Sequence, residues 1–200
     1  MLLLSGGIDS PVAGKLLQEQ GVELEAVHFS LEPFTDAAPE AKCVELARRL
    51  GLRELLVLPA GPVFAELPKL CHPKLYFVLS KRMMVRAASR LAKERGCTAL
   101  ATGESVGQVS SQTLPNLRTI DAAADVPVLR PLLGHDKSEI VALAEGWGTF
   151  DISKGPEVCD VLGPDRPMTR SDPAQATAEE VKLPAELIER LLDGLRSVAL

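Results

Sequence analysis

Six residues near the start of the chain, Ser5 to Ser10, have the types and order of a site that binds an anion. The apolar run 1–4 before them is short enough to be one buried strand, and Pro11 after them suits the first position of a helix. The two glycines can take positive φ and let a ligand approach the backbone, and the two serines add hydroxyl donors. The first turn of a helix has unbonded N–H groups that attract negative charge. These features predict a site for a phosphate or pyrophosphate.

Two better-known phosphate motifs do not fit this stretch. Gly14 and Lys15 imitate the end of the Walker A pattern, but Leu16 replaces its metal-binding hydroxyl. Asp9 stands where the first glycine of that pattern should be, and the dinucleotide fingerprint G-x-G-x-x-G is absent as well. The order Ser-Gly-Gly-x-Asp-Ser instead resembles the PP-loop of the N-type ATP pyrophosphatases, which split ATP between its α and β phosphates. The alternative is a tight strand-to-helix turn with no ligand.

The composition favours an ordinary globular protein. The chain has 200 residues, 46% of them hydrophobic and 24% charged, which suits one domain with a full core. The net charge of −5 is a poor footprint for a free-standing nucleic-acid binder, so any RNA contact would need a local basic patch or a partner. No apolar run approaches the roughly 20 residues of a membrane span, and the first residues do not read as a signal peptide. We expect a cytoplasmic location and no membrane partner.

The four cysteines form no metal or disulfide pattern. They are Cys43, Cys71, Cys97 and Cys159, and no two make a C-x-x-C pair. Cys43 and Cys97 lie in helix-like and strand-like patterns, which predicts small buried side chains. Cys159 lies in an irregular, Pro-rich stretch, where an exposed and reactive thiol is expected.

Strands and helices alternate along the chain, which is typical of an α/β fold. The expected strands are 1–4, 22–29, 53–58, 97–102 and 126–129. One expected helix starts at Pro11, and the others cover 39–50, 75–95, 116–124, 137–145 and 184–198. We predict a three-layer open parallel sheet of about five strands with helices on both faces. Residues 1–162 would form the PP-loop domain, with a Pro-rich loop and C-terminal helix at 163–200 packed on it.

A second glycine turn, at Gly103, follows the fourth expected strand. If the first and fourth strands are neighbours at the switch point of the sheet, this turn and the loop at Ser5 to Ser10 flank a single ligand. His28 ends the second strand at the same edge and is either a ligand contact or an ordinary strand-end side chain. The expected helix 75–95 carries a basic stripe made of Arg82, Arg86, Arg90 and Lys93. That stripe is either a solvated charged face or a holder of nucleotide phosphates or RNA backbone.

Several stretches, in order, resemble one PP-loop family, the tRNA 4-thiouridine synthetases (ThiI). They are 4–13, His28-Phe29, Lys81-Arg82-Met83-Met84 with Arg86, 102–113, Leu129-Arg130-Pro131-Leu132, Asp136-Lys137 and Pro156 to Cys159. The resemblance implies that ATP adenylates the C4 oxygen of a tRNA uridine at position 8 and releases pyrophosphate. A persulfide on the catalytic Cys159, loaded by a cysteine desulfurase or another donor, would then displace AMP and leave 4-thiouridine. The same sulfur-carrying apparatus also serves thiamine thiazole synthesis in the family.

The resemblance also implies a set of site residues. By match, the ATP site is lined by Leu3, Leu4, Ser5, Gly6, Gly7, Asp9, Ser10, His28, Phe29, Lys81, Gly103 and Gln112. Relatives usually have Arg where Lys81 stands, so Arg82 could share its role. Mg²⁺ would bridge the phosphates, with Asp9 as its nearby carboxylate and a further catalytic group.

The family pattern is not complete in this sequence. Family members carry ferredoxin-like and THUMP domains before the PP-loop, which hold tRNA, and many carry a rhodanese domain with a second cysteine after it. This sequence starts at the PP-loop strand, so we expect tRNA to be held through a separate or missing RNA-binding domain. Two alternatives stay open: a PP-loop pyrophosphatase or ligase acting on a small molecule, and a nucleotide-binding module that needs a THUMP partner.

Overall fold

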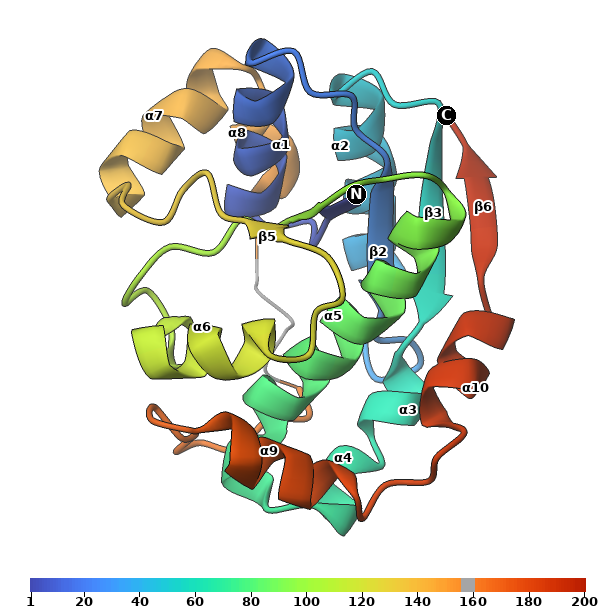
Figure 1. Cartoon of the computed structure of the whole chain (residues 1–200). Helices are drawn as coiled ribbons and strands as arrows, with labels where there is room; N and C mark the ends of the chain where they lie inside the picture. Colours follow the sequence, from blue (N-terminus) through green and yellow to red (C-terminus); the bar gives the residue numbers. More distant parts are fainter. Residues whose placement is uncertain (156–160) are drawn as a thin grey trace.

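The fold is built on a six-stranded sheet in the order β5-β4-β1-β2-β3-β6 (Figure 1). The computed structural model describes residues 1–155 and 161–200. Neighbouring strands among β1 to β5 pair in parallel, and β6 pairs antiparallel with β3 at one edge. The strands are β1 (Leu2–Leu3), β2 (Ala26–Ser30), β3 (Glu54–Pro59), β4 (Leu100–Ala101), β5 (Val128–Leu129) and β6 (Arg196–Ala199).

Helices cover both faces of the sheet. Helices α1 (Asp9–Glu19) and α2 (Ala38–Arg49) lie on one face, and the long α5 (Tyr76–Glu94) lies on the other (Figure 1). The remaining helices are α3 (Gly61–Phe64), α4 (Leu67–Leu70), α6 (Leu114–Asp121), α7 (Lys137–Gly146), α8 (Phe150–Ser153), α9 (Pro173–Glu180) and α10 (Leu187–Asp193), with 3₁₀ turns η1 (Pro73–Leu75) and η2 (Ser110–Gln112).

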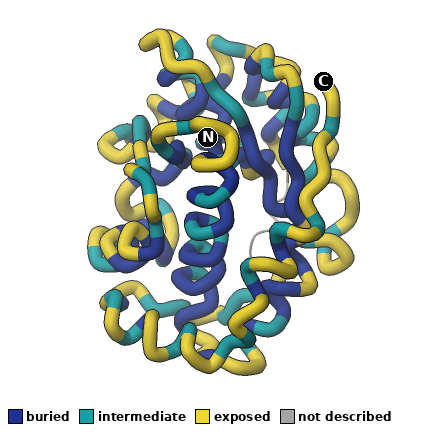
Figure 2. The backbone as a smooth tube through the Cα atoms, turned by 45° about the vertical axis from the view of Figure 1, so that its right-hand side comes forward, coloured by how far each residue is buried: buried dark blue, intermediate teal, exposed yellow. Residues whose placement is uncertain are grey.

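Successive side chains of the strands point to opposite faces of the sheet and pack in two separate core clusters. In β2, Val27 and Phe29 pack in the cluster under α5, whereas Ala26 packs in the cluster under α1 and α2. This alternation is what a strand covered on both faces requires, because successive side chains point to opposite sides. Figure 2 shows the inner strands and the long central helix as mostly buried and the connecting loops as mostly exposed. The predicted three-layer α/β fold is confirmed.

The order of the strands reverses at β1. The chain runs from β1 outward through β2 and β3, then crosses to β4 on the other side of β1, where Leu2 pairs with Ala101. Ligands of open α/β sheets bind at the carboxyl ends of strands at such a switch point. The expected adjacency of the first and fourth strands is therefore confirmed, and it brings the loops after them together.

The C-terminal segment differs from the prediction. The apolar spacing predicts one helix over 184–198, but α10 ends at Asp193 and β6 follows. Gly194 allows the turn, since an ideal Cβ there would lie 2.4 Å from Pro59 Cγ. Strand β6 then pairs with β3 from Val57 to Glu54 and covers an edge whose N–H and C=O groups would otherwise be unpaired. The sheet thus gains a sixth, antiparallel strand that helical periodicity does not reveal.

Other boundaries move by a few residues. Helix α1 begins at Asp9 rather than at Pro11, so the Asp9 carboxylate lies in the first turn. Helix α6 begins at Leu114 because the Thr113 hydroxyl accepts a hydrogen bond from Asn116 N and caps it. Within residues 1–155 and 161–200, no helix is both long and apolar enough to cross a membrane.

Candidate functional site

The loop from Ser5 to Ser10 follows β1 at the switch point. Gly6 has φ of +77°, which favours glycine, and an ideal Cβ there would lie 3.1 Å from Pro39 O. The Ser5 N–H donates to Ser10 Oγ at 3.0 Å, and the two serine hydroxyls lie 3.1 Å apart. No described side chain caps the first turn of α1, so its N–H groups remain available to an anion.

Gly103 brings the second loop against the first. An ideal Cβ on Gly103 would lie 2.5 Å from Ser10 N and 2.6 Å from the carbonyl carbon of Asp9. These are backbone atoms that cannot rotate away, so only glycine permits this approach. The two glycine turns therefore lie against each other, as their positions after the first and fourth strands predict, at the switch point where open α/β sheets bind ligands in a crevice.

Asp9 has a partner that the sequence analysis did not assign. Lys137 Nζ lies 2.7 Å from Asp9 Oδ1, although the two residues are far apart in the sequence. Lys137 is the first residue of α7, where Asp136 and Glu139 form a capping box that fixes the helix start. Lys137 lies in a stretch that resembles the family, but no local pattern relates it to Asp9. The start of α7 thus places the Lys137 ammonium beside Asp9 in the first loop.

The chemistry of the site offers limited support for a metal ion. The described residues hold no cluster of three His, Cys, Asp or Glu side chains that could bind a metal. Asp9 is the carboxylate in the loop, and Lys137 already balances its charge. Mg²⁺ in nucleotide sites is commonly held by one or two carboxylates and by phosphate oxygens, so Asp9 could contribute one ligand when phosphates supply the others.

Lys81 reaches the crevice from α5 and pairs with a buried carboxylate. Its Nζ lies 2.6 Å from Glu104 Oε1, and Glu104 follows Gly103 directly. Thr102 Oγ1 donates to the other oxygen of Glu104 at 3.1 Å. Burial alone would raise the pKa of Glu104, but the charges of Lys81 and Arg130 outweigh it and hold that pKa below its ordinary value. Glu104 is therefore ionised and holds the Lys81 ammonium beside the loop.

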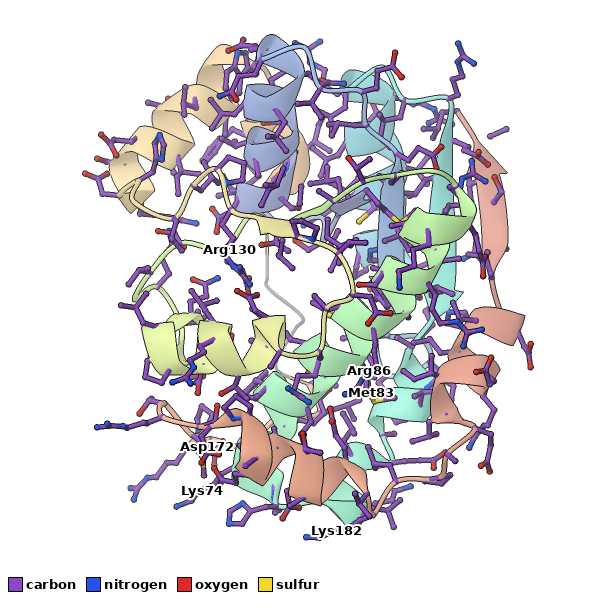
Figure 3. All side chains as sticks on the ribbon, viewed as in Figure 1. Lys74, Met83, Arg86, Arg130, Asp172 and Lys182 are labelled. Atoms are coloured by element: carbon purple, nitrogen blue, oxygen red, sulfur yellow. The ribbon has the colours of Figure 1, made fainter. Side chains whose placement is uncertain are left out.

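Arg130 completes this charged group from the other side. Its Nε donates to Glu104 Oε2 at 2.8 Å, and its two terminal nitrogens bind both carboxylate oxygens of Asp121. Figure 3 shows Arg130 pointing from the segment after β5 toward α6, which carries Asp121. Both the Arg130 and Glu104 side chains are more than nine-tenths buried, whereas Lys81 is 27% exposed. Lys81 is thus the member of the group that solvent and ligands can reach.

His28 is the middle residue of β2, which runs on to Ser30 instead of ending at the histidine as predicted, and it lies on the face covered by α2. Its Nδ1 is 3.0 Å from the carbonyl oxygen of Leu4 and 3.1 Å from Cys43 Sγ. Burial lowers the pKa of His28, which favours the neutral ring. A proton on Nδ1 that is donated to Leu4 O leaves Nε2 as an acceptor, and Nε2 is buried with no partner in the described chain.

Gln112 provides a second buried acceptor without a partner. Its backbone is held, since its carbonyl oxygen accepts from Gly107 N and its N–H donates to Val109 O. The side-chain Oε1 is buried and finds no donor among the described residues. An unmet acceptor of this kind costs about 1–3 kcal/mol, and a ligand that donates a hydrogen bond removes the cost. The ribose hydroxyls and adenine amino group of ATP are such donors, and the assignment of His28 and Gln112 to ATP stays a prediction.

The apolar members of the predicted ATP set lie at or near the carboxyl ends of β1 and β2. Leu3 is half-buried at the end of β1, Leu4 is buried, and Phe29 is a core residue at 7% exposure. Their backbone positions at the ends of β1 and β2 are what brings them near the switch point.

Arg82 does not fit the prediction. Its side chain is 2% exposed, and its Nε and Nη2 donate to the two oxygens of Glu180 at 2.7 and 2.8 Å. Its Nη1 donates to Thr119 O at 2.5 Å. The guanidinium is therefore committed to joining α5, α6 and α9, and we withdraw Arg82 from the predicted ATP site.

The rest of the basic stripe is also paired within the molecule. Arg86 binds Glu180 of α9, and Figure 3 shows it where α5 passes that helix. Arg90 binds Glu189 of α10, and Lys93 binds Asp125. These ion pairs favour a structural role for the stripe, while the alternative of a phosphate-binding or RNA-binding face stays a prediction.

Cys159 lies outside the described residues, with the whole of 156–160. The described chain before it is held near the first loop, because Lys42 Nζ donates to Lys154 O at 3.0 Å. The Cβ of Lys42 would lie 3.6 Å from an ideal Cβ on Gly6. Residue 154 is thus tied to the segment of α2 that contacts the loop.

Comparison with known proteins gives consistent matches. A family model described as thiamine biosynthesis protein (ThiI) matches residues 1–184. A probable tRNA sulfurtransferase of Streptococcus gordonii is 40% identical over 203 residues, which is 98% of this chain and 50% of that protein. One from Moorella thermoacetica is 41% identical over 202 residues, which is 98% of this chain and 52% of that protein. The chain therefore spans about half the length of the curated relatives it matches.

Solved structures match as well. A 4-thiouridine synthetase–RNA complex with bound ATP has a TM-score of 0.94 and 37% identity, covering 100% of this chain and 54% of that chain. NMN synthetase from Francisella tularensis has a TM-score of 0.58 and 19% identity, covering 94% of this chain and 80% of that one, which indicates the fold alone.

Proposed function

The chain belongs to the ThiI family, and from this premise we propose that it is the ATP-using part of a tRNA sulfurtransferase that converts a uridine to 4-thiouridine. The observation that carries the proposal is the contact of Gly103 with the backbone of Ser10, which joins two glycine turns into one crevice. The start of α1 has no side-chain cap, Lys137 pairs with Asp9 and Lys81 with Glu104, and two buried acceptors have no partner among the described residues. ATP bound in a similar solved structure supports the same use here.

The residues support an adenylation step. The uridine O4 attacks the α-phosphorus of ATP, the bond from that phosphorus to the β-bridging oxygen breaks and pyrophosphate leaves. The N3 proton of the uracil passes to solvent, so that the adenylated base is neutral. Negative charge builds on the leaving group. The N–H groups of the loop and of the α1 start would bind that charge, with Lys81 and Lys137 beside them. Mg²⁺ bound to the phosphates would offset more of the charge, with Asp9 as its protein ligand.

Glu104 makes Lys81 available for this step. A phosphate that draws Lys81 away would leave a buried carboxylate with one cation fewer. Arg130 and Thr102 keep their hydrogen bonds to Glu104, so the carboxylate stays compensated. Arg130 is fixed in turn by Asp121. Moving Lys81 away from Glu104 therefore costs less free energy than removing the only partner of a buried ion would.

Cys159 would complete the reaction. The terminal sulfur of a persulfide on Cys159 attacks C4 of the adenylated uridine, and AMP leaves with the former O4. A further thiol then attacks the resulting disulfide, so that sulfur stays on the base and Cys159 leaves in a disulfide. The persulfide would come from a cysteine desulfurase or another donor. The Pro156 to Cys159 stretch supports this role through its resemblance to the family.

Pyrophosphate release tests the proposal. ATP is incubated with the chain with and without unmodified tRNA and a persulfide donor, and the RNA is then analysed by mass spectrometry for sulfur. We expect pyrophosphate only with tRNA, and sulfur in the RNA only with the donor. Release that ignores tRNA would instead favour a small-molecule ligase.

A sulfur step in thiamine thiazole synthesis is a second candidate. The description of the matching family model, thiamine biosynthesis protein, favours it. The two candidates separate at Gly103. If the thiazole step uses sulfur transfer alone, growth of a deficient cell without added thiamine should require Cys159 but not ATP binding at the Gly103 turn, whereas tRNA thiolation should require both.

A further inference from the structure

The loop after β4 carries a second amide side chain whose hydrogen bonds are not accounted for. Gln108 Nε2 is buried and has no acceptor among the described residues, and no described residue bonds to its Oε1. The resemblance assigns Gln112 to ATP but gives Gln108 no role. A buried donor without an acceptor is unusual in a folded protein and indicates a missing partner.

The loop itself does not need Gln108 to keep its shape. Backbone bonds join Gly107 to Gln112 at 3.0 Å and Gln112 to Val109 at 2.9 Å, and Val106 N donates to Leu133 O at 3.2 Å. The loop starts at Gly103, which rests on the first loop. The Gln108 amide is thus carried on a well-held segment at the nucleotide crevice and is left over for a ligand.

Exposed apolar side chains flank Gln108 in the sequence, and another lies on the neighbouring loop. Val106 is 45% exposed and Val109 is 49% exposed, on either side of Gln108. Leu133, whose carbonyl oxygen binds Val106 N, is 37% exposed. Aliphatic surface next to an unpaired amide suits a flat ring with a polar edge, which is how proteins bind a base taken out of its stack.

We propose that the Gln108 amide reads the N3–H and O2 edge of the target uracil, with Val106 and Val109 against the face of the base. This inference rests on the proposed function. Oε1 accepts from N3–H and Nε2 donates to O2, which leaves O4 unbonded to attack the phosphorus. Cytosine has an acceptor at N3 and would face Oε1 with no proton between them. Gln108 is therefore a specificity-determining residue that selects uridine over cytidine.

The test compares Gln108→Leu and Gln108→Glu with the wild-type chain. The readouts are RNA-dependent pyrophosphate release with unmodified tRNA and the Kd for ATP. We expect kcat/KM for tRNA to fall about 10- to 100-fold in both variants with an unchanged ATP Kd. Gln20→Leu, at an exposed position after α1, is the matched control and should behave as wild type.

A modified RNA separates base reading from a structural effect. A tRNA with 2-thiouridine at the target position keeps O4 and the N3–H but replaces the O2 acceptor with sulfur, which accepts hydrogen bonds more weakly. Wild-type protein should use it less efficiently than uridine, whereas Gln108→Leu should discriminate much less, because its contact is already lost. Equal discrimination in both proteins, or unchanged kcat/KM in Gln108→Leu, would overturn the inference. Loss of ATP binding in Gln108→Leu would also overturn it, by assigning the amide to ATP. Wild-type protein without RNA-dependent release would instead refute the proposed function, and this inference with it.

Discussion

Replacing Gly103 with alanine puts a methyl group where the structure has backbone. The new Cβ would lie 2.5 Å from Ser10 N and 2.7 Å from Ser10 Cα, against an ordinary contact distance of 3.4 Å or more. The two loops would have to separate by about 0.9 Å at their closest point, because neither atom belongs to a side chain that can rotate away. A shift of this size reaches both halves of the proposed ATP site at once.

The expected effects are large on activity and moderate on stability. Strain from an added methyl in a close-packed contact costs about 1–3 kcal/mol, which lowers Tm by about 2–4 °C per kcal/mol for a chain of this size. Misplacing catalytic groups by about 1 Å can cost about 100-fold in rate. We therefore expect Gly103→Ala to fold, to bind ATP more weakly and to release pyrophosphate about 100-fold more slowly.

The assay pairs this variant with Gly134→Ala. Gly134 is also in a loop, and an ideal Cβ there meets nothing within 4 Å. Thermal denaturation, ATP titration and pyrophosphate release are measured on both variants and the wild type. Gly134→Ala should match the wild type in all three. Gly103→Ala with wild-type ATP affinity and rate would refute the claim that the two glycine turns form one site.

Three further predictions follow from the charged groups and from Cys159. Arg82→Met leaves Glu180 short of its buried partner and should reduce the free energy of unfolding by about 3–5 kcal/mol in urea denaturation, with the ATP Kd unchanged; a weaker ATP Kd would return Arg82 to the site. The pKa of Glu104 is held low despite burial, because Lys81 and Arg130 outweigh the desolvation. The stabilising contribution of Glu104 is therefore complete above the unfolded-state pKa of about 4.3 and is lost as pH falls through the lower folded-state pKa. Acid denaturation should begin below about pH 4.3, and Glu104→Gln should make the free energy of unfolding depend less on pH in this range. Cys159→Ser should still release pyrophosphate with tRNA but leave no sulfur in the RNA, and thiolation equal to wild type in a deficient cell would remove Cys159 from the mechanism.

Local patterns in the sequence were enough to predict the fold class and the adjacency of the two glycine turns. The Ser5 to Ser10 stretch and the Gly103 turn each follow a short apolar strand, and the switch-point rule then places them together. The structure confirms this adjacency. The start of α7 was predicted correctly because its capping box, from Asp136 to Glu139, is visible in the sequence.

Features that depend on distant pairing could not be predicted. Helical spacing put Arg82 on a basic stripe, but only the packed α9 shows that Glu180 neutralises it. The contact of Lys137 with Asp9 joins two helix starts that are 128 positions apart. Strand β6 forms because β3 has an edge that would otherwise be unpaired. The residues 196–199 by themselves carry no strand pattern strong enough to end the helix that the preceding apolar spacing predicts. In each case the deciding interaction is with a residue on another element.

The path of one oxygen atom tests the central claim most directly. A tRNA transcript is prepared with ¹⁸O at C4 of the target uridine and is incubated with the chain, ATP and a persulfide donor. Because O4 attacks the α-phosphorus and later leaves with it, the label should appear in AMP, with unlabelled pyrophosphate and sulfur in the RNA. Unlabelled AMP, label that stays in the RNA, or ADP and phosphate as products would contradict adenylation of the uridine at this site.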